Sequence, residues 1–100
     1  MAKRHFFVRL IPPRATFPYD MSPEEESLMA SHAEYLRGRF EDGRLVVYGP
    51  VLSENPFGLI VAEADEEREV HELMAGDPTI ASGLNTYDIA PMHVTGARGN

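Results

Sequence analysis

The chain has 100 residues, of which 43% are hydrophobic, and its 16 acidic and 9 basic residues give a formal net charge of −7 at pH 7. This length and composition are typical of one soluble globular domain with a single core. Lysine and arginine form no cluster that could follow a phosphate backbone, so we expect neither nucleic acid nor a membrane as partner. The absence of cysteine excludes disulfides, thiol nucleophiles and thiolate metal sites.

The N-terminal residues are basic, and the apolar run that follows them is short and interrupted by Arg9. Such a run is too short for a signal peptide or a membrane span. We therefore expect a cytoplasmic location by default.

Residues 5–11 are mostly aromatic or branched, and they predict a strand that is apolar on both faces. Alternation places one set of side chains on the first face, namely Phe6, Val8 and Leu10, and another on the second face, namely Phe7, Arg9 and Ile11. Two prolines end this strand. Residues 14–21 are then expected to form an irregular connection that is long enough to cover a site.

Residues 22–43 carry the clearest helical pattern of the chain. Ser22 is a good N-cap, and Glu25 three residues later completes a capping box. Gly43 is predicted to end the helix in the left-handed conformation. His32 lies in the middle of the apolar arc, where the pattern favours an aliphatic side chain. An imidazole at that position requires a reason.

Residues 44–51 and 57–64 predict two strands that form a hairpin. Gly49 and Pro50 lie near the end of the first of these strands and indicate a bulge or an edge position, because proline cannot donate to a ladder.

Asp65 is expected to cap a second helix that ends at Gly76, also in the left-handed conformation. Asp77 and Pro78 then predict a turn, residues 80–82 are compatible with a further helical turn, and residues 87–94 predict the fourth strand.

The order strand, helix, strand, strand, helix, strand predicts an α+β fold of the ferredoxin-like βαββαβ type. We expect a four-stranded antiparallel sheet with its helices on one face. Residues 1–96 would form the single domain and residues 97–100 a disordered tail. The second face would expose Phe7, Ile11 and Val47, which predicts a homodimer that packs sheet on sheet into an α/β barrel.

Few residues indicate chemistry by pattern alone. His71 follows Glu67 by one helical turn, which could make half of a metal site, although a solvated helix face is the favoured interpretation. Arg9 stands alone on an apolar strand and would need an anionic partner or a wet cavity, unless it extends to the edge of the sheet. We expect no metal and no cofactor.

His32 and Asp77 form the pair of greatest interest. A carboxylate on one ring nitrogen would fix the tautomer of a histidine that gives or takes a proton with the other nitrogen. The alternative interpretation makes His32 a core histidine bonded to a backbone carbonyl and Asp77 the start of the turn that follows the second helix. The residue pattern by itself favours this alternative.

Three stretches resemble the YCII-related (YciI-like) family of small proteins. Two of these stretches are long, and the third is Ile89-Ala90-Pro91-Met92; the long ones read HAEYLRGRFEDGRLVVYGPV from His32 and GLIVAEADEEREVHELMAGDPTIASGL from Gly58. The resemblance covers most of residues 4–95, and the helix histidine with the Asp-Pro aspartate is its most specific part. This sequence departs from the family in residues 14–21, in Met-Ala-Ser before the histidine, and in Thr79 after Asp-Pro.

The resemblance implies a ferredoxin-like fold that dimerises through its sheets, with an active site that contains His32 and Asp77. The family is similar to muconolactone isomerases and includes a dehydrochlorinase of a chlorinated hydroxyquinol, and both reactions transfer protons without a metal or an organic cofactor.

Two functions therefore stay open. In the first, His32 and Asp77 catalyse proton transfer on a small cyclic or aromatic organic acid or phenol in an isomerase or lyase reaction, and Arg9, Arg14 and Tyr35 are the candidate substrate-binding residues. In the second, the same dimeric barrel is a non-catalytic module for small-ligand binding or assembly. A histidine that lines a cavity and has a partner within hydrogen-bond reach favours the first.

Overall fold

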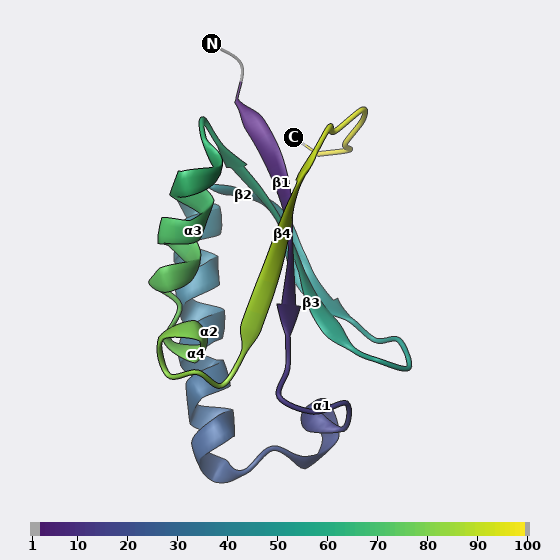
Figure 1. The fold of residues 1–100 in the computed structure, drawn as a ribbon, viewed down its shortest axis with the longest axis vertical. Helices are drawn as coiled ribbons and strands as arrows, with labels where there is room; N and C mark the ends of the chain where they lie inside the picture. The colour runs from purple at the N-terminus through teal and green to yellow at the C-terminus, as the bar shows by residue number, and fades with distance from the viewer. Residues whose placement is uncertain (1–2, 100) are drawn as a thin grey trace.

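A computed structural model describes residues 3–99 and shows a sheet with its main helices on one face (Figure 1). The elements follow one another as β1 (Arg4–Ile11), α1 (Phe17–Asp20), α2 (Pro23–Glu41), β2 (Leu45–Val51), β3 (Phe57–Ala64), α3 (Glu67–Ala75), α4 (Pro78–Ala81) and β4 (Thr86–Met92). The strand order is β2-β3-β1-β4, and all neighbouring pairs are antiparallel. This confirms the ferredoxin-like fold. In residues 3–99 no helix has the length and apolar character to span a bilayer.

The α2 helix begins with the predicted capping box. The Ser22 hydroxyl accepts from the Glu25 backbone N–H at 3.2 Å, and the Glu25 carboxylate accepts from the Ser22 N–H at 2.9 Å. The helix runs for 19 residues to Glu41, and Gly43 then adopts a φ of +85°. The left-handed stop predicted at Gly43 is therefore confirmed, because only glycine enters that region without strain.

Gly43→Ala is expected to lower the free energy of unfolding by about 1 kcal/mol, because the space around Gly43 is open and only the positive φ opposes a side chain. Gly38 is a matched control in the same helix: it also lies in open space but has ordinary helical geometry, so Gly38→Ala should raise the free energy of unfolding by about 0.5–1 kcal/mol. Urea denaturation of both variants checks the opposite signs. Two changes of the same sign would contradict this account of the helix end.

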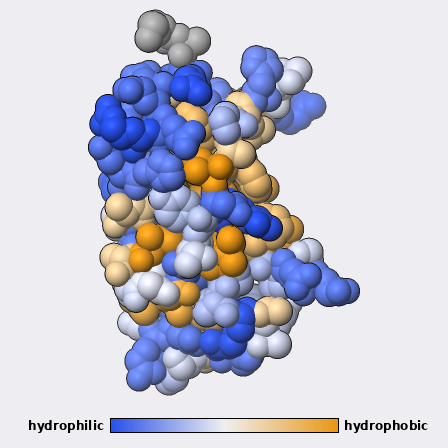
Figure 2. Space-filling view, in the orientation of Figure 1, coloured by the Kyte–Doolittle hydropathy of each residue, from blue (hydrophilic) through white to orange (hydrophobic). Residues whose placement is uncertain are grey.

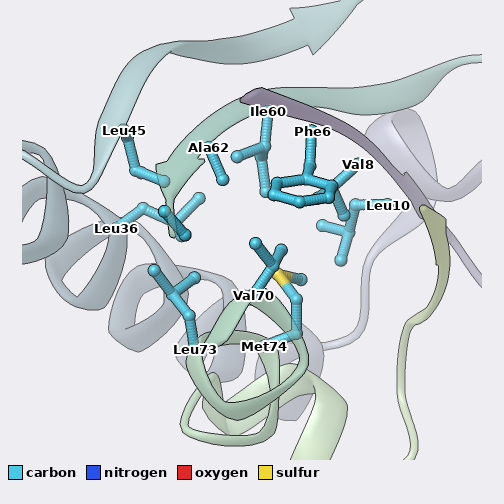
Figure 3. Close-up of a cluster of buried hydrophobic side chains, with 11 residues drawn as sticks. Phe6, Val8, Leu10, Leu36, Leu45, Ile60, Ala62, Val70, Leu73 and Met74 are labelled. Carbon is cyan, nitrogen blue, oxygen red and sulfur yellow. The ribbon is translucent and has the colours of Figure 1, made fainter. Parts of the chain in front are cut away.

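The core lies between the helices and the sheet face that they cover (Figure 3). Side chains of β1 and β3 meet apolar side chains of α2 and α3 there. The buried cluster comprises Phe6, Val8, Leu10, Leu36, Leu45, Ile60, Ala62, Ala64, Val70, Leu73 and Met74. The register explains this selection, because Phe6 opposes Ala62 and Val8 opposes Ile60 across the sheet, and cross-strand partners share a face.

The other sheet face carries no helix and is largely apolar. We call it the open face, and it presents Phe7, Ile11, Val47, Val51, Phe57, Leu59, Val61 and Ala90, together with an Arg9–Asp88 pair and a His5–Glu63 pair. Val47 is 49% exposed. Hydrophobic residues reach the surface on the side of the molecule that faces away from the helices (Figure 2).

The β2 strand lies at the edge of the sheet, as Pro50 indicated, because the strand order places only β3 beside it. The irregularity in its pairing lies between Leu45 and Val47 rather than at Gly49 and Pro50. At this edge, Pro50 pairs with Gly58 without interrupting the register.

Residues 14–21 are more ordered than the sequence indicated, because they include the short helix α1. Phe17 is buried at 3% exposure, and the Arg14 guanidinium lies 5.3 Å from the centre of its ring. The apolar anchor and the cation above it explain why this connection folds against the domain.

The α3 helix differs from the prediction at its start and at its end. The helix begins at Glu67, so the N-cap is Glu66 rather than Asp65. The Glu69 carboxylate accepts from the backbone N–H groups of both Asp65 and Glu66, at 2.8 and 3.3 Å. Gly76 has a φ of −81°, so the left-handed conformation predicted for it is wrong. Glycine is favoured there by space, since a Cβ would overlap the Tyr35 hydroxyl and lie 3.0 Å from Tyr35 Cζ.

The last strand ends at Met92, two residues earlier than predicted. Residues 93–99 form no helix or strand, and the predicted disorder of residues 97–100 stays a prediction. Asn100 lies outside the described residues.

Candidate active site

A cavity of about 370 Å³ lies between α2, α1 and the end of the β2–β3 hairpin. Its walls are mostly apolar, with Pro12, Phe17, Met29, Leu36, Leu52 and Ile60 among them. Three polar side chains also line it, from His32, Tyr48 and Asn85. No Asp, Glu, Lys or Arg side chain belongs to the lining among residues 3–99. The cavity suits a small and largely apolar molecule with a few polar groups.

His32 and Asp77 meet at this cavity although 45 residues separate them in the sequence. His32 Nδ1 lies 2.6 Å from Asp77 Oδ2, and the residues are 9% and 0% exposed. Asp77 is also the N-cap of α4, where its Oδ1 accepts from the backbone N–H and the hydroxyl of Thr79 at 2.8 and 2.9 Å. The turn that follows α3 thus fixes the carboxylate under the middle of α2.

The hydrogen bonds keep the Asp77 carboxylate ionised. Burial raises the pKa of Asp77, but the hydrogen bond from His32, the charge of His32 and the two bonds from Thr79 together lower this pKa below its ordinary value. An ionised carboxylate requires a proton on the facing ring nitrogen, so His32 Nδ1 donates. His32 Nε2 is then the ring nitrogen left for a ligand, and it has no hydrogen-bond partner among residues 3–99.

This geometry distinguishes the two interpretations of the pair. The core interpretation required a hydrogen bond from His32 to a backbone carbonyl, but the ring binds the Asp77 carboxylate instead. His32 also borders a cavity rather than a fully packed interior. The contact with Asp77 is present. The catalytic role of the two residues stays a prediction.

Arg9 lies on the open face and does not belong to the cavity lining. Its guanidinium binds the Asp88 carboxylate at 2.7 Å, and both side chains are about half exposed, at 47% and 54%. The anionic partner that the sequence required is therefore a neighbour across the sheet. The suggestion that Arg9 extends to an edge is wrong, because β1 lies between β3 and β4.

Arg14 lies near the cavity in the chain, but its charge is already paired. Its guanidinium binds Asp20 at 2.9 Å and Glu25 at 2.8 Å, and the bond from Arg14 is the main reason that the pKa of Glu25 falls to about 2. Because Glu25 also closes the capping box of α2, Arg14 ties the connection to the start of that helix. Arg14 does not belong to the cavity lining.

Tyr35 points from α2 toward α3 instead of into the cavity. Its hydroxyl donates to the Leu73 carbonyl at 2.6 Å, and the Arg39 guanidinium lies 5.0 Å from the centre of its ring. The structure therefore does not bring Arg9, Arg14 or Tyr35 to the cavity that contains His32.

Asn85 is a cavity residue that the sequence analysis did not find. It lies between Gly83 and β4 and is 2% exposed. Nothing in the local pattern indicates it, because an asparagine in a short connection close to a glycine ordinarily belongs to a turn.

His71 lies outside the cavity on α3 and is half exposed, with a side-chain exposure of 46%. Its ring lies 3.3 Å from Glu67 Oε2 and 2.6 Å from the Tyr87 hydroxyl. Between residues 3 and 99, no group of three or more His, Cys, Asp or Glu side chains is arranged to hold a metal ion.

Comparison with known proteins identifies the family. A family model described as the YCII-related domain matches residues 6–93. The fold is similar to a solved structure of 5-chloro-2-hydroxyhydroquinone dehydrochlorinase from Burkholderia phenoliruptrix AC1100 in complex with 2,5-dihydroxybenzoquinone, with a TM-score of 0.68, 18% sequence identity and coverage of 89% of this chain and 93% of that one. This likeness shows the fold alone. No curated protein matches the sequence. Because the family model spans nearly the whole chain, the protein belongs to the YCII-related family.

Proposed function

We propose that the protein is a cofactor-independent enzyme of the isomerase or lyase type, in which His32 transfers a proton on a small hydroxylated cyclic or aromatic substrate. The observation that carries this proposal is the 2.6 Å contact between His32 Nδ1 and Asp77 at the wall of an apolar cavity. A structural neighbour named as a dehydrochlorinase of a hydroquinone supports the substrate class.

The proposed step uses His32 Nε2 as a general base. Nε2 takes a proton from an O–H or C–H group of the substrate, and the ionised Asp77 stabilises the imidazolium that forms. The electron pair left on the substrate then shifts a double bond. In an isomerisation the imidazolium returns the proton to another atom, and in an elimination a leaving group departs as an anion. Apolar walls favour such a transfer because they exclude water.

Turnover by the wild-type protein tests the proposal. Chlorinated hydroxyquinols and unsaturated lactones represent the elimination and isomerisation classes, and their conversion can be followed by absorbance, with chloride release measured for the former. Turnover in either class that depends on His32 supports an enzyme. Saturable binding without turnover across both classes would instead support the ligand-binding module.

We further propose that two subunits associate through the open face as a homodimer. Phe7, Ile11, Val47 and Leu59 would give a monomer a larger continuous apolar surface than soluble monomers usually tolerate. Packing two such faces against each other would bury these side chains.

Val47→Glu is expected to convert the dimer into a monomer, because Val47 is 49% exposed on the open face and the dimer would enclose the new carboxylate. Ser27→Glu adds the same charge on an exposed position of α2 and should leave the mass unchanged. Light scattering at micromolar concentration measures both. A monomeric wild type would remove the proposal of a dimer without affecting the cavity.

A further inference from the structure

We propose that Asn85 is a ligand-binding residue of the cavity, and that the ligand is an uncharged ring with two oxygen substituents, one facing His32 and the other Asn85. This inference rests on the proposed function in taking the cavity as the substrate site. To the contact with His32 it adds a second polar contact, with Asn85, and it specifies that the substrate is uncharged.

Asn85 is held firmly in place but is poorly satisfied. Its backbone N–H donates to the Thr79 carbonyl at 3.0 Å, which joins it to the turn that carries Asp77. Its side-chain nitrogen lies 3.6 Å from Met29 Sδ, a weak acceptor. No residue from 3 to 99 donates a hydrogen bond to its side-chain oxygen. One N–H and the carbonyl oxygen of the amide thus stay unused at 2% exposure.

Among residues 3–99 no fully buried side-chain nitrogen or oxygen lacks a hydrogen-bond partner, so the unpaired oxygen of Asn85 is accessible from the cavity that the residue lines. This side chain forms no hydrogen bond to a nitrogen or oxygen of another residue from 3 to 99, and it lines the same cavity as His32. An amide presents both a donor and an acceptor, so it suits either a hydroxyl or a carbonyl oxygen. A ligand that carries such a group would satisfy the amide and displace water from apolar walls.

The charges around the cavity favour a neutral ligand. No cationic side chain lines it among the described residues, and Arg9 and Arg14 are each bound to carboxylates elsewhere. The ionised Asp77 lies directly behind His32 and would repel an anion. A carboxylate-bearing ring would lose its hydration without gaining a partner. The substrate class is therefore narrowed from organic acids and phenols to uncharged phenols and quinones.

Titration calorimetry with hydroquinone, phenol and benzoate tests this assignment by binding alone. Wild type should bind hydroquinone more tightly than phenol, and benzoate at least about tenfold more weakly than phenol. Asn85→Leu, which is close to asparagine in size, should weaken hydroquinone binding by about tenfold, while phenol, which keeps only the contact to His32, should change by less than about threefold.

A purely structural role for Asn85 predicts a different effect of Asn85→Leu on thermal stability. If the amide held the fold, Asn85→Leu would lower the midpoint of thermal unfolding. A ligand-binding amide predicts an equal or higher midpoint, since the substitution removes only a weak contact to Met29 Sδ and adds an apolar side chain to an apolar wall. Equal loss for hydroquinone and phenol, benzoate binding as tight as that of phenol, or no saturable binding of hydroquinone at millimolar concentration would overturn the assignment. Because no turnover is measured, a catalytically silent His32 would remove the proposed enzyme and leave this result unaffected.

Discussion

Replacement of Asp77 by alanine is expected to lower the free energy of unfolding by about 3–5 kcal/mol, because it removes the acceptor of three buried donors. His32 Nδ1, the Thr79 backbone N–H and the Thr79 hydroxyl all bind this carboxylate, which is fully buried. Urea denaturation followed by circular dichroism measures the loss. Asp88→Ala removes a carboxylate that is 54% exposed and paired with Arg9, and it should have a much smaller effect.

The pH dependence of stability gives the sign of the Asp77 contribution. Because the pKa of Asp77 is lowered in the folded protein, its stabilising effect is present above the unfolded value of about 3.9 and is lost as the pH falls through the lower folded value. The difference in unfolding free energy between wild type and Asp77→Asn should therefore shrink as the pH falls below about 4. A difference that stays constant down to pH 2 would contradict the ionised pair.

Replacement of His32 by glutamine is expected to lower kcat/KM by about 10²–10⁴-fold for a substrate turned over by wild type, because an amide cannot accept the proton. Glutamine is similar in size and can still donate to Asp77, so the fold should be retained. Steady-state kinetics with a thermal unfolding control check this. The loss should lie mainly in kcat, since proton transfer is made only in the transition state.

His71→Gln is the matched control for His32. His71 is half exposed on α3 and borders Tyr87 and Glu67, so its loss should leave kcat/KM unchanged. Full activity of His32→Gln would disprove the proposed general base. An equal loss in both variants would indicate a general change in the protein rather than in the cavity.

Local sequence patterns were enough to predict most of the fold. Strand alternation predicted β3 with its observed bounds, Phe57–Ala64, and it separated the two faces of β1 correctly. The capping box at Ser22 and the stop at Gly43 predicted α2, because these contacts form between residues close in the chain. Gly76 shows the limit of such reasoning, since the space beside Tyr35 on another helix and not a backbone requirement favours glycine there.

Which residues line the cavity depended on tertiary structure. Sequence reasoning and the family resemblance singled out His32 and Asp77, but their 2.6 Å contact depends on how the turn after α3 packs under α2. Arg9 and Arg14 are absent from the cavity because carboxylates elsewhere bind them, and Tyr35 is absent because its hydroxyl reaches the Leu73 carbonyl. Asn85 enters it because its backbone is bonded to Thr79, a contact that its own neighbours in the chain do not reveal. The sequence by itself therefore determined the elements and their faces, whereas long-range packing decided which polar groups meet.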